Sequence, residues 1–142
     1  PYKFQVELTA AAVVEKLAGK DFDWKVCYQS RVGPLEWIQP YTEDEIRRAG
    51  KDYVPLIVVP IAFVSEHSET LVELDIEYRD LARDVGVPEY IRISTVGSAA
   101  AFIASLGSLI ADVHGSGAKL CSENGTRLCP PDRSQCAFAV AS

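Results

Sequence analysis

The stretch that decides the fold is LIVVPIAFVSEHSETLVELDIEY, residues 56–78. It opens with an apolar run, which is typical of a central parallel strand covered on both faces. It continues as a helical pattern that carries Glu69, Glu73 and Glu77, with His67 just before it. Acids four residues apart share one helix face and repel one another by roughly 0.2–0.5 kcal/mol per pair. The row is therefore either a solvated face or a site for something positive.

The rest of the chain alternates between strand and helix patterns. Open α/β sheets bind ligands at the carboxyl ends of their strands, so a histidine and carboxylates after a parallel strand indicate metal or proton handling. Alternating elements imply right-handed βαβ crossovers and a parallel sheet. We therefore predict an α/β fold with three αβα layers. The predicted strands are 24–29, 54–63 and 90–93, and the predicted helices are 4–17, 42–49, 69–83 and 98–113.

Local signals add detail to these elements. Glycine is a common helix stop, so we expect the second helix to end before Gly50. His114 is expected to end the last helix, and residues 115–117 then read as a flexible join. This divides the chain into a domain of residues 1–114 and an extension of residues 115–142. The predicted apolar positions of the acidic helix are Leu71, Leu74, Ile76, Tyr78 and Leu81.

Composition narrows the class of protein. The chain has 142 residues and a net charge of −6, which argues against a nucleic-acid surface. No apolar run reaches the ~18 residues of a spanning helix, and no charged-then-apolar signal segment is present. The chain starts at Pro1 and contains no methionine, so we expect it to be part of a longer protein.

A loop of residues 30–41 follows the first predicted strand. It carries Trp37 and Tyr41 beside Arg31. A loop aromatic at a strand end either covers a core edge or packs on a flat apolar ligand. The residues of the loop leave both interpretations open.

Two long segments resemble the ferrochelatase family. They are YQSRVGPLEWIQPYT, residues 28–42, and SEHSETLVELDIEY, residues 65–78. The resemblance implies a chelatase-like fold of two similar α/β domains with a porphyrin cleft between them. This chain resembles most of the second domain, so one domain would be incomplete. The resemblance also implies a Ser-x-His-Ser motif on the first strand of that domain, whose histidine is the other central catalytic residue. The first predicted strand, residues 24–29, does not carry it, and the Ser-x-His-Ser at residues 65–68 belongs to the segment that resembles the metal-site helix.

The resemblance also implies a role for each matching residue. Glu69 would be the acid/base, and His67 would support the inner site or orient a neighbour. Glu69, His67, Glu73 and Glu77 would handle the metal, with the last two forming an outward line for metal or protons. The porphyrin would contact Trp37, Phe63, Arg31 and Ser30, although a solvated Arg31 is an open alternative.

The tail carries Cys121, Cys129 and Cys136 in a polar, proline-containing segment. Some ferrochelatases hold a [2Fe–2S] cluster on a similar extension, and thiolates are the usual ligands of such clusters. The three tail cysteines would then need a fourth ligand from elsewhere. Cys27, in a predicted strand, reads as a small buried hydrophobe. Zinc or free thiols are the alternatives.

The hypothesis that results is an enzyme that inserts ferrous iron into protoporphyrin IX, the last step of haem biosynthesis. The chain alone is expected to be inactive without the missing N-terminal half. Alternatives are a chelatase for coproporphyrin or another tetrapyrrole, a non-catalytic haem- or iron-binding module, and a pure interaction domain. The resemblance implies a cytoplasmic protein with peripheral contact to the inner membrane and a homodimeric state. No nucleic-acid partner is expected.

Overall fold

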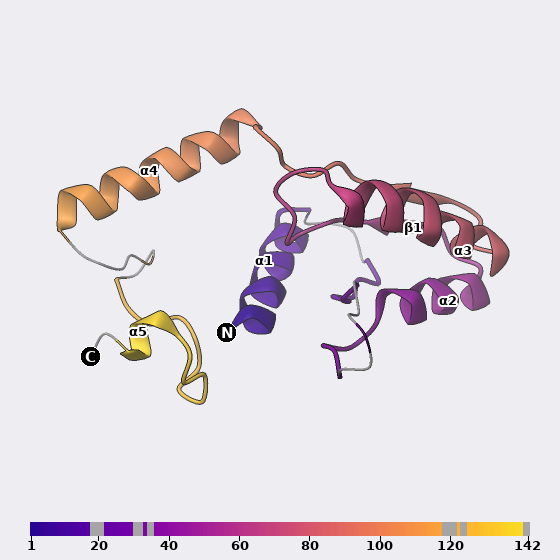
Figure 1. The fold of residues 1–142 in the computed structure, drawn as a ribbon, viewed down its shortest axis with the longest axis horizontal. Coiled ribbons are helices and arrows are strands. Elements are labelled where there is room, and N and C mark those ends of the chain that lie inside the picture. Colours follow the sequence, from indigo (N-terminus) through magenta and orange to yellow (C-terminus); the bar gives the residue numbers. More distant parts are fainter. Residues whose placement is uncertain (18–21, 30–32, 34–35, 118–121, 123–124, 141–142) are drawn as a thin grey trace. The chain divides into compact units, whose positions relative to one another are not determined.

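The structure is a computed structural model that describes residues 1–17, 22–29, 33, 36–117, 122 and 125–140. The chain divides into two compact units. One unit comprises residues 6–97, and the other combines residues 1–5 with residues 98–142. Helix α1 (Tyr2–Lys16) begins in the second of these and continues in the first, as the sequence predicts for residues 4–17 (Figure 1).

A parallel two-stranded sheet lies in the unit of residues 6–97. Strand β1 (Leu56–Val58) pairs with β2 (Tyr90–Arg92), with Leu56 opposite Tyr90 and Val58 opposite Arg92. β1 is shorter than the predicted strand 54–63. Pro55 precedes it and Pro60 follows it, and a proline cannot donate to a ladder. The parallel pairing confirms the predicted α/β class of the chain.

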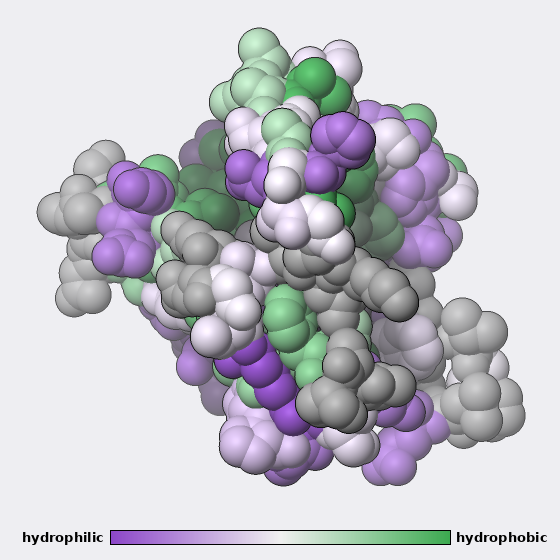
Figure 2. All heavy atoms as spheres, turned by 90° about the vertical axis from the view of Figure 1, so that its left-hand side faces the viewer, coloured by the Kyte–Doolittle hydropathy of each residue, from purple (hydrophilic) through white to green (hydrophobic). Residues whose placement is uncertain are grey.

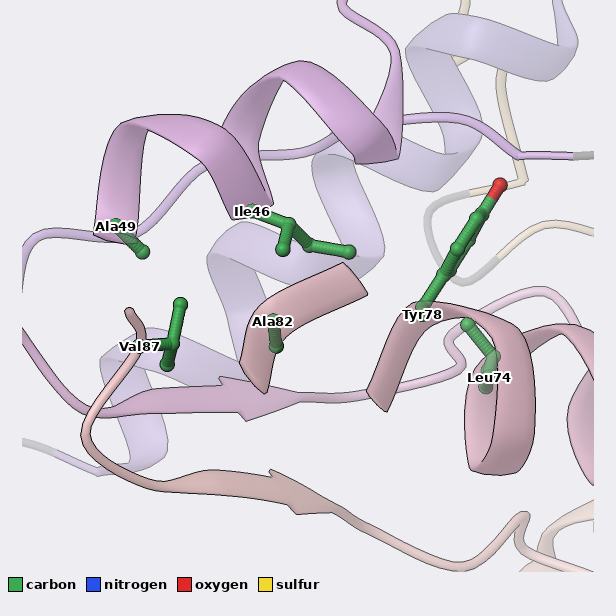
Figure 3. Close-up of a cluster of buried hydrophobic side chains, with 6 residues drawn as sticks. All are labelled: Ile46, Ala49, Leu74, Tyr78, Ala82 and Val87. Carbon is green, nitrogen blue, oxygen red and sulfur yellow. The ribbon is translucent and has the colours of Figure 1, made fainter. Parts of the chain in front are cut away.

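The core of this unit is built by helices on one side of the sheet. Helix α2 (Thr42–Asp52) packs against α3 (Tyr78–Asp84). Figure 3 shows Ile46 and Ala49 of α2 pointing toward the elements that carry Ala82 and Val87, above the two strands. The buried cluster comprises Ile46, Ala49, Leu74, Tyr78, Ala82 and Val87.

The acidic helix is not an ordinary α-helix along its first half. Residues Glu69–Glu77 form the π-helix η1, whose hydrogen bonds span five residues, and α3 continues directly from it. The predicted apolar face is therefore wrong in part. Leu71 is exposed, because it lies three residues before Leu74 and residues three apart no longer share a face on these wider turns. Ile76 is exposed as well, since it lies two residues from both Leu74 and Tyr78, which are buried. The buried side chains follow a spacing of four: Thr70, Leu74, Tyr78 and Ala82.

The predicted strand 24–29 does not form in the described chain. Its one pairing is an isolated parallel bridge between Tyr28 and Tyr41. Tyr28 accepts from the Thr42 N–H at 3.1 Å and donates to the Pro40 carbonyl at 2.9 Å. A strand needs a neighbour along its length, and this segment finds one at a single residue.

Gly50 is inside α2 rather than at its end, which corrects the predicted stop at this glycine. The helix ends with Tyr53 in the left-handed conformation, at φ 52°. A Cβ on Gly50 would lie 2.3 Å from the Val85 carbonyl oxygen. The glycine therefore serves the close approach of α2 to the end of α3.

The other unit contains α4 (Ala100–Ser116) and α5 (Ala137–Val140). His114 and Gly115 are helical, so the predicted end at His114 and the predicted join at residues 115–117 are wrong. Gly117, at φ 64°, caps the helix. α4 buries no residue. On the face of the molecule shown in Figure 2, apolar (green) and hydrophilic (purple) residues are both exposed. The division at residue 114 stays a prediction.

None of the helices in the described ranges combines the length and apolar character that crossing a membrane requires.

The close approach at Gly50 gives a stability prediction. We expect Gly50→Ala to lower the free energy of unfolding by about 1–3 kcal/mol, because the new methyl group overlaps backbone and overpacks the contact. This loss outweighs the gain of about 1 kcal/mol that alanine brings to a helix interior. Denaturant unfolding followed by circular dichroism measures the change.

The matched control is Gly107→Ala in the middle of α4, where no atom lies within 4 Å of the added Cβ. This variant should be neutral or slightly stabilising. A Gly50→Ala protein as stable as its Gly107→Ala counterpart contradicts the packing argument.

Candidate functional site

The acidic row lies on η1 beside the buried stripe. Glu69 and Glu73 are half-buried and Glu77 is exposed. A π-helix has about 4.4 residues per turn, so a step of four residues falls about 33° short of a full turn, whereas in an α-helix the same step exceeds a full turn by about 40°. The three carboxylates therefore stay along one face, as the sequence predicts. Each is one residue before a buried position, since Thr70, Leu74 and Tyr78 point into the core.

His67 caps the start of η1. Its Nδ1 accepts the Glu69 N–H at 3.2 Å, and its carbonyl accepts the N–H groups of Thr70 and Leu71 at 3.0 and 2.8 Å. The Thr70 hydroxyl closes this turn by accepting the His67 N–H at 2.9 Å. An acceptor Nδ1 places the proton of a neutral imidazole on Nε2. The imidazole thus orients Glu69 and presents an N–H donor.

Phe63 fixes the plane of this imidazole. The two rings meet edge to face, with centroids 4.6 Å apart and planes at 81°. Such an arrangement is favourable for aromatic rings. Phe63, predicted as a porphyrin-wall residue, therefore also supports His67.

Gln29 joins the loop to the acidic row. Its Nε2 donates to the Glu69 carbonyl at 2.8 Å and to Glu73 Oε2 at 3.1 Å. Its carbonyl accepts the Trp37 indole N–H at 2.9 Å. Two predicted porphyrin and metal residues, Trp37 and Glu73, are thus connected through one residue that sequence reasoning did not select. A polar residue at the end of an apolar run was the available signal.

The remaining loop residues divide between described and undescribed positions. Trp37 is 37% exposed, so its ring is not part of the core. Ser30 and Arg31, predicted to contact the porphyrin, lie outside the described residues.

A second group missed by sequence reasoning surrounds Arg92 at the end of β2. Arg92 donates from Nε to Asp75 Oδ1 at 2.8 Å, from Nη2 to Asp75 Oδ2, and from Nη1 to Glu66 Oε1 at 2.7 Å. Glu66 Oε1 also accepts the Thr95 N–H at 2.9 Å. Hydrogen bonds from Thr70, Thr95 and Arg92 lower the pKa of Glu66 to about 2, and Arg92 lowers the pKa of Asp75. Both carboxylates are therefore ionised structural partners.

The tail brings two of the predicted cluster cysteines together. Cys129 and Cys136 are both buried, at 8% and 6% exposed. Burial and the hydrogen bond with the Cys136 thiol raise the pKa of the Cys129 thiol. Cys121 lies outside the described residues.

One guanidinium organises this turn. Arg127 donates to the carbonyls of Cys129, Pro130 and Arg133 at 3.0, 2.7 and 2.8 Å. No local sequence pattern predicts this clamp, since arginine-to-carbonyl contacts depend on the path of the backbone.

Across the part of the chain that the structure describes, no three histidine, cysteine or carboxylate side chains converge into a metal-binding group. The acids of η1 are instead spread along the helix, and the two described tail cysteines form a pair.

Together these features define an α/β protein with a row of carboxylates beside a histidine after a parallel strand. Comparison with known proteins places this class in one family: the sequence profile of ferrochelatases matches residues 1–113. The chain belongs to the ferrochelatase family, as its two motifs predict.

Individual relatives agree. A ferrochelatase of Caulobacter vibrioides is 51% identical over 136 residues, which cover 96% of this chain and 39% of the relative. A ferrochelatase of Rickettsia bellii is 51% identical over 139 residues, with coverages of 96% and 39%. One from Rickettsia conorii is 48% identical over 144 residues, with coverages of 100% and 42%. The chain spans about two fifths of the length of these relatives.

Tyr90 gives a prediction at alkaline pH. Its hydroxyl donates to the Leu74 carbonyl at 2.9 Å, and burial, followed by the Asp75 carboxylate, raises its pKa from 10.0 to about 12. A raised folded pKa means that the stability is present below pH 10 and is lost as the pH rises toward 12. We expect Tyr90→Phe to flatten this fall by at most about 1.4 kcal/mol per pH unit, less after solvent screening.

Urea unfolding at several alkaline pH values measures the slope. Tyr53→Phe is the control, because Tyr53 is 75% exposed and its loss should leave the slope unchanged. Equal slopes for wild type and Tyr90→Phe would show that Tyr90 ionises freely.

Proposed function

We propose that this chain forms part of an enzyme that inserts ferrous iron into protoporphyrin IX to make haem. The acidic row of Glu69, Glu73 and Glu77 carries the proposal, because metal insertion needs a base for the released protons and a weak metal site, and carboxylates suit both tasks. Family membership and relatives named ferrochelatase support it. Those relatives are more than twice as long as this chain, so we propose that further residues complete the cleft.

Proton removal is the first chemical task. A porphyrin loses two pyrrole N–H protons when a divalent metal enters, so the site needs a base beside the ring. We propose Glu69 as this base, because its carboxylate leads the row and its backbone is held at both ends. His67 accepts its N–H, and Gln29 donates to its carbonyl. A base held in this way loses little freedom on reaction.

His67 is proposed to serve this base first as a positioning group. Its Nδ1 already accepts a backbone N–H, so its Nε2 carries the proton in the neutral state. Ligation of iron through Nε2 would need the proton on Nδ1, against the Glu69 N–H. The alternative role that the resemblance implies, a direct metal contact, stays a prediction.

Glu73 and Glu77 are proposed as the route for iron or protons. Ferrous iron is the substrate, and a row of weak oxygen ligands can hand over the ion where a closed site would retain it. Glu73 is the half-buried member and accepts from Gln29, whereas Glu77 is exposed. The row thus runs from a restrained carboxylate to a solvated one, which suits entry from water.

The porphyrin is proposed to contact the aromatic side of this site. Trp37 is anchored through its indole N–H and remains 37% exposed, so its ring has a free face for a flat ligand. Phe63 is the second proposed wall residue. Ser30 and Arg31 are proposed to contact the porphyrin as well, with Arg31 near its carboxylates.

Replacing the proposed base gives the main test. In the full-length protein that contains this chain, we expect Glu69→Gln to lower metal insertion by about 10²-fold or more, because an amide cannot take the pyrrole protons. Zinc insertion into protoporphyrin, followed by the loss of free-base fluorescence, measures the rate. Zinc replaces ferrous iron to avoid oxidation.

Glu43→Gln is the matched control, an exposed acid on α2 that should leave turnover unchanged. Turnover that survives Glu69→Gln would show that Glu69 is not the base, while the proposed chelatase activity would stand. Porphyrin binding without insertion of any divalent metal would favour a haem- or iron-binding module, and turnover on coproporphyrin alone would change the substrate.

We also propose a [2Fe–2S] cluster on Cys121, Cys129 and Cys136, with a fourth ligand from elsewhere in the protein. The donor chemistry of the described part fits, because the Cys129 and Cys136 thiols are buried and hydrogen-bonded to each other. The Arg127 clamp holds the turn that carries them and adds a positive charge near an anionic cluster. Such a cluster would cross-link the tail and supply a one-electron centre.

The cluster has its own test. We expect the anaerobically purified protein to contain about two irons and two sulfides per chain and to show visible cluster absorbance. Cys129→Ser should abolish both signals, and Cys27→Ser should leave them, since Cys27 is expected to pack as a small hydrophobe. Absence of iron and sulfide from the wild type, or their persistence in Cys129→Ser, contradicts the proposal.

Partners and location complete the proposal. We propose a homodimer in the cytoplasm with peripheral contact to the inner membrane. Protoporphyrin is lipophilic, which supports exchange at a membrane surface, and several apolar side chains of α4 are exposed, including Ile103, Leu109 and Ile110.

A further inference from the structure

Two residues of β2 hold η1 from the same side. Tyr90 and Arg92 are two positions apart on the strand, so their side chains point to one face of the sheet. Tyr90 donates its hydroxyl proton to the Leu74 carbonyl at 2.9 Å. Arg92 grips the neighbouring residue, Asp75, with two donors. One strand thus fastens two consecutive residues of the π-helix, one through its backbone and the other through its side chain.

These contacts lie where the wide turns give way to α-helical turns. The Tyr78 N–H bonds to the Glu73 carbonyl, five residues back, and α3 starts at Tyr78. Where hydrogen bonds that span five residues change to bonds that span four, one backbone carbonyl is left without a backbone N–H donor. The next carbonyl after Glu73 is that of Leu74, and the Tyr90 hydroxyl supplies a donor there. The contact therefore stabilises the junction that keeps the preceding turns wide.

Arg92 also reaches the other end of the helix. Its Nη1 donates at 2.7 Å to Glu66, just before the His67 cap, while its Nε and Nη2 hold Asp75. The Arg92 side chain is 9% exposed, so water competes weakly for these charge-assisted bonds. One guanidinium therefore brackets the segment that carries Glu69 and Glu73.

We propose that Tyr90 and Arg92 are positioning residues for the acidic row, acting through the wide turns of η1. This inference rests on the proposed function. The row repels itself, and a base works when its geometry is held within about 0.5 Å by surrounding contacts. The strand supplies that restraint from behind the row, since neither Tyr90 nor Arg92 contacts a carboxylate of Glu69, Glu73 or Glu77 in any described hydrogen bond.

The experiment uses Tyr90→Phe and Arg92→Lys in the full-length protein that contains this chain. Phenylalanine removes one hydroxyl and lysine keeps the charge while losing the two-donor grip, so both variants should fold. We expect kcat for zinc insertion to fall about tenfold in each, with the KM for protoporphyrin within about twofold of wild type. Amide hydrogen exchange should accelerate in residues 69–77 and stay unchanged in α2.

Arg83→Lys is the matched control, because Arg83 is an exposed arginine of α3 whose ion pairs are with Asp80 and Asp84. It should change neither kcat nor exchange in residues 69–77. Unchanged kcat in both test variants overturns the proposal, as does faster exchange that spreads equally into α2, which would indicate general loss of stability.

These measurements distinguish failure of the restraint on η1 from failure of the proposed function. A wild-type protein that inserts no metal overturns the proposed function, whereas the exchange data still decide whether Tyr90 and Arg92 hold η1. Faster exchange confined to residues 69–77 supports the restraint, and unchanged exchange overturns it.

Discussion

Burial of every fourth residue along one helix is the constraint on which the rest of the structure depends. Thr70, Leu74, Tyr78 and Ala82 are all buried, and this stripe packs against Ile46 and Ala49 of α2. Burying a side chain such as that of Leu74 contributes roughly 1.5–3 kcal/mol. Repulsion within the acidic row costs roughly 0.2–0.5 kcal/mol per pair, so burial decides how the helix is rotated.

The packing of this stripe also determines where the acidic row lies. Glu69, Glu73 and Glu77 each precede a buried residue by one position, so they lie on the flank of the stripe rather than opposite it. On this flank a carboxylate is partly accessible to water while the buried residues anchor its helix. Gln29 exploits this arrangement, since it contacts the Glu69 backbone and the Glu73 carboxylate while its own carbonyl holds Trp37. Gln29 therefore connects the loop that carries Trp37 to the acidic row through hydrogen bonds.

The sequence predicted the parts of this arrangement that depend on spacing alone. A step of four residues keeps acids on one face in both α- and π-helices, so the row was predicted correctly without knowing the helix type. The apolar face was predicted only in part, because the three-residue spacing of Leu71 and Leu74 does not keep them on one face in the wide turns, and Ile76 lies between two buried positions. Gly50 was misread for a similar reason: its role depends on Val85, which is distant in the sequence. The ties through Gln29 and Arg92 are tertiary contacts that no local pattern encodes.

The π-helix has a consequence for how such a site tolerates change over evolution. Exposed positions between the acids, such as Leu71 and Ile76, have few contacts to satisfy and should accept many side chains. The number of residues is a stricter requirement. A single deletion between Thr70 and Ala82 would shift every later residue by one position, so the acids and buried residues before the deletion would no longer line up with those after it. The number of residues in this helix should therefore be preserved as strictly as their identities. Insertions or deletions should be far rarer there than substitutions.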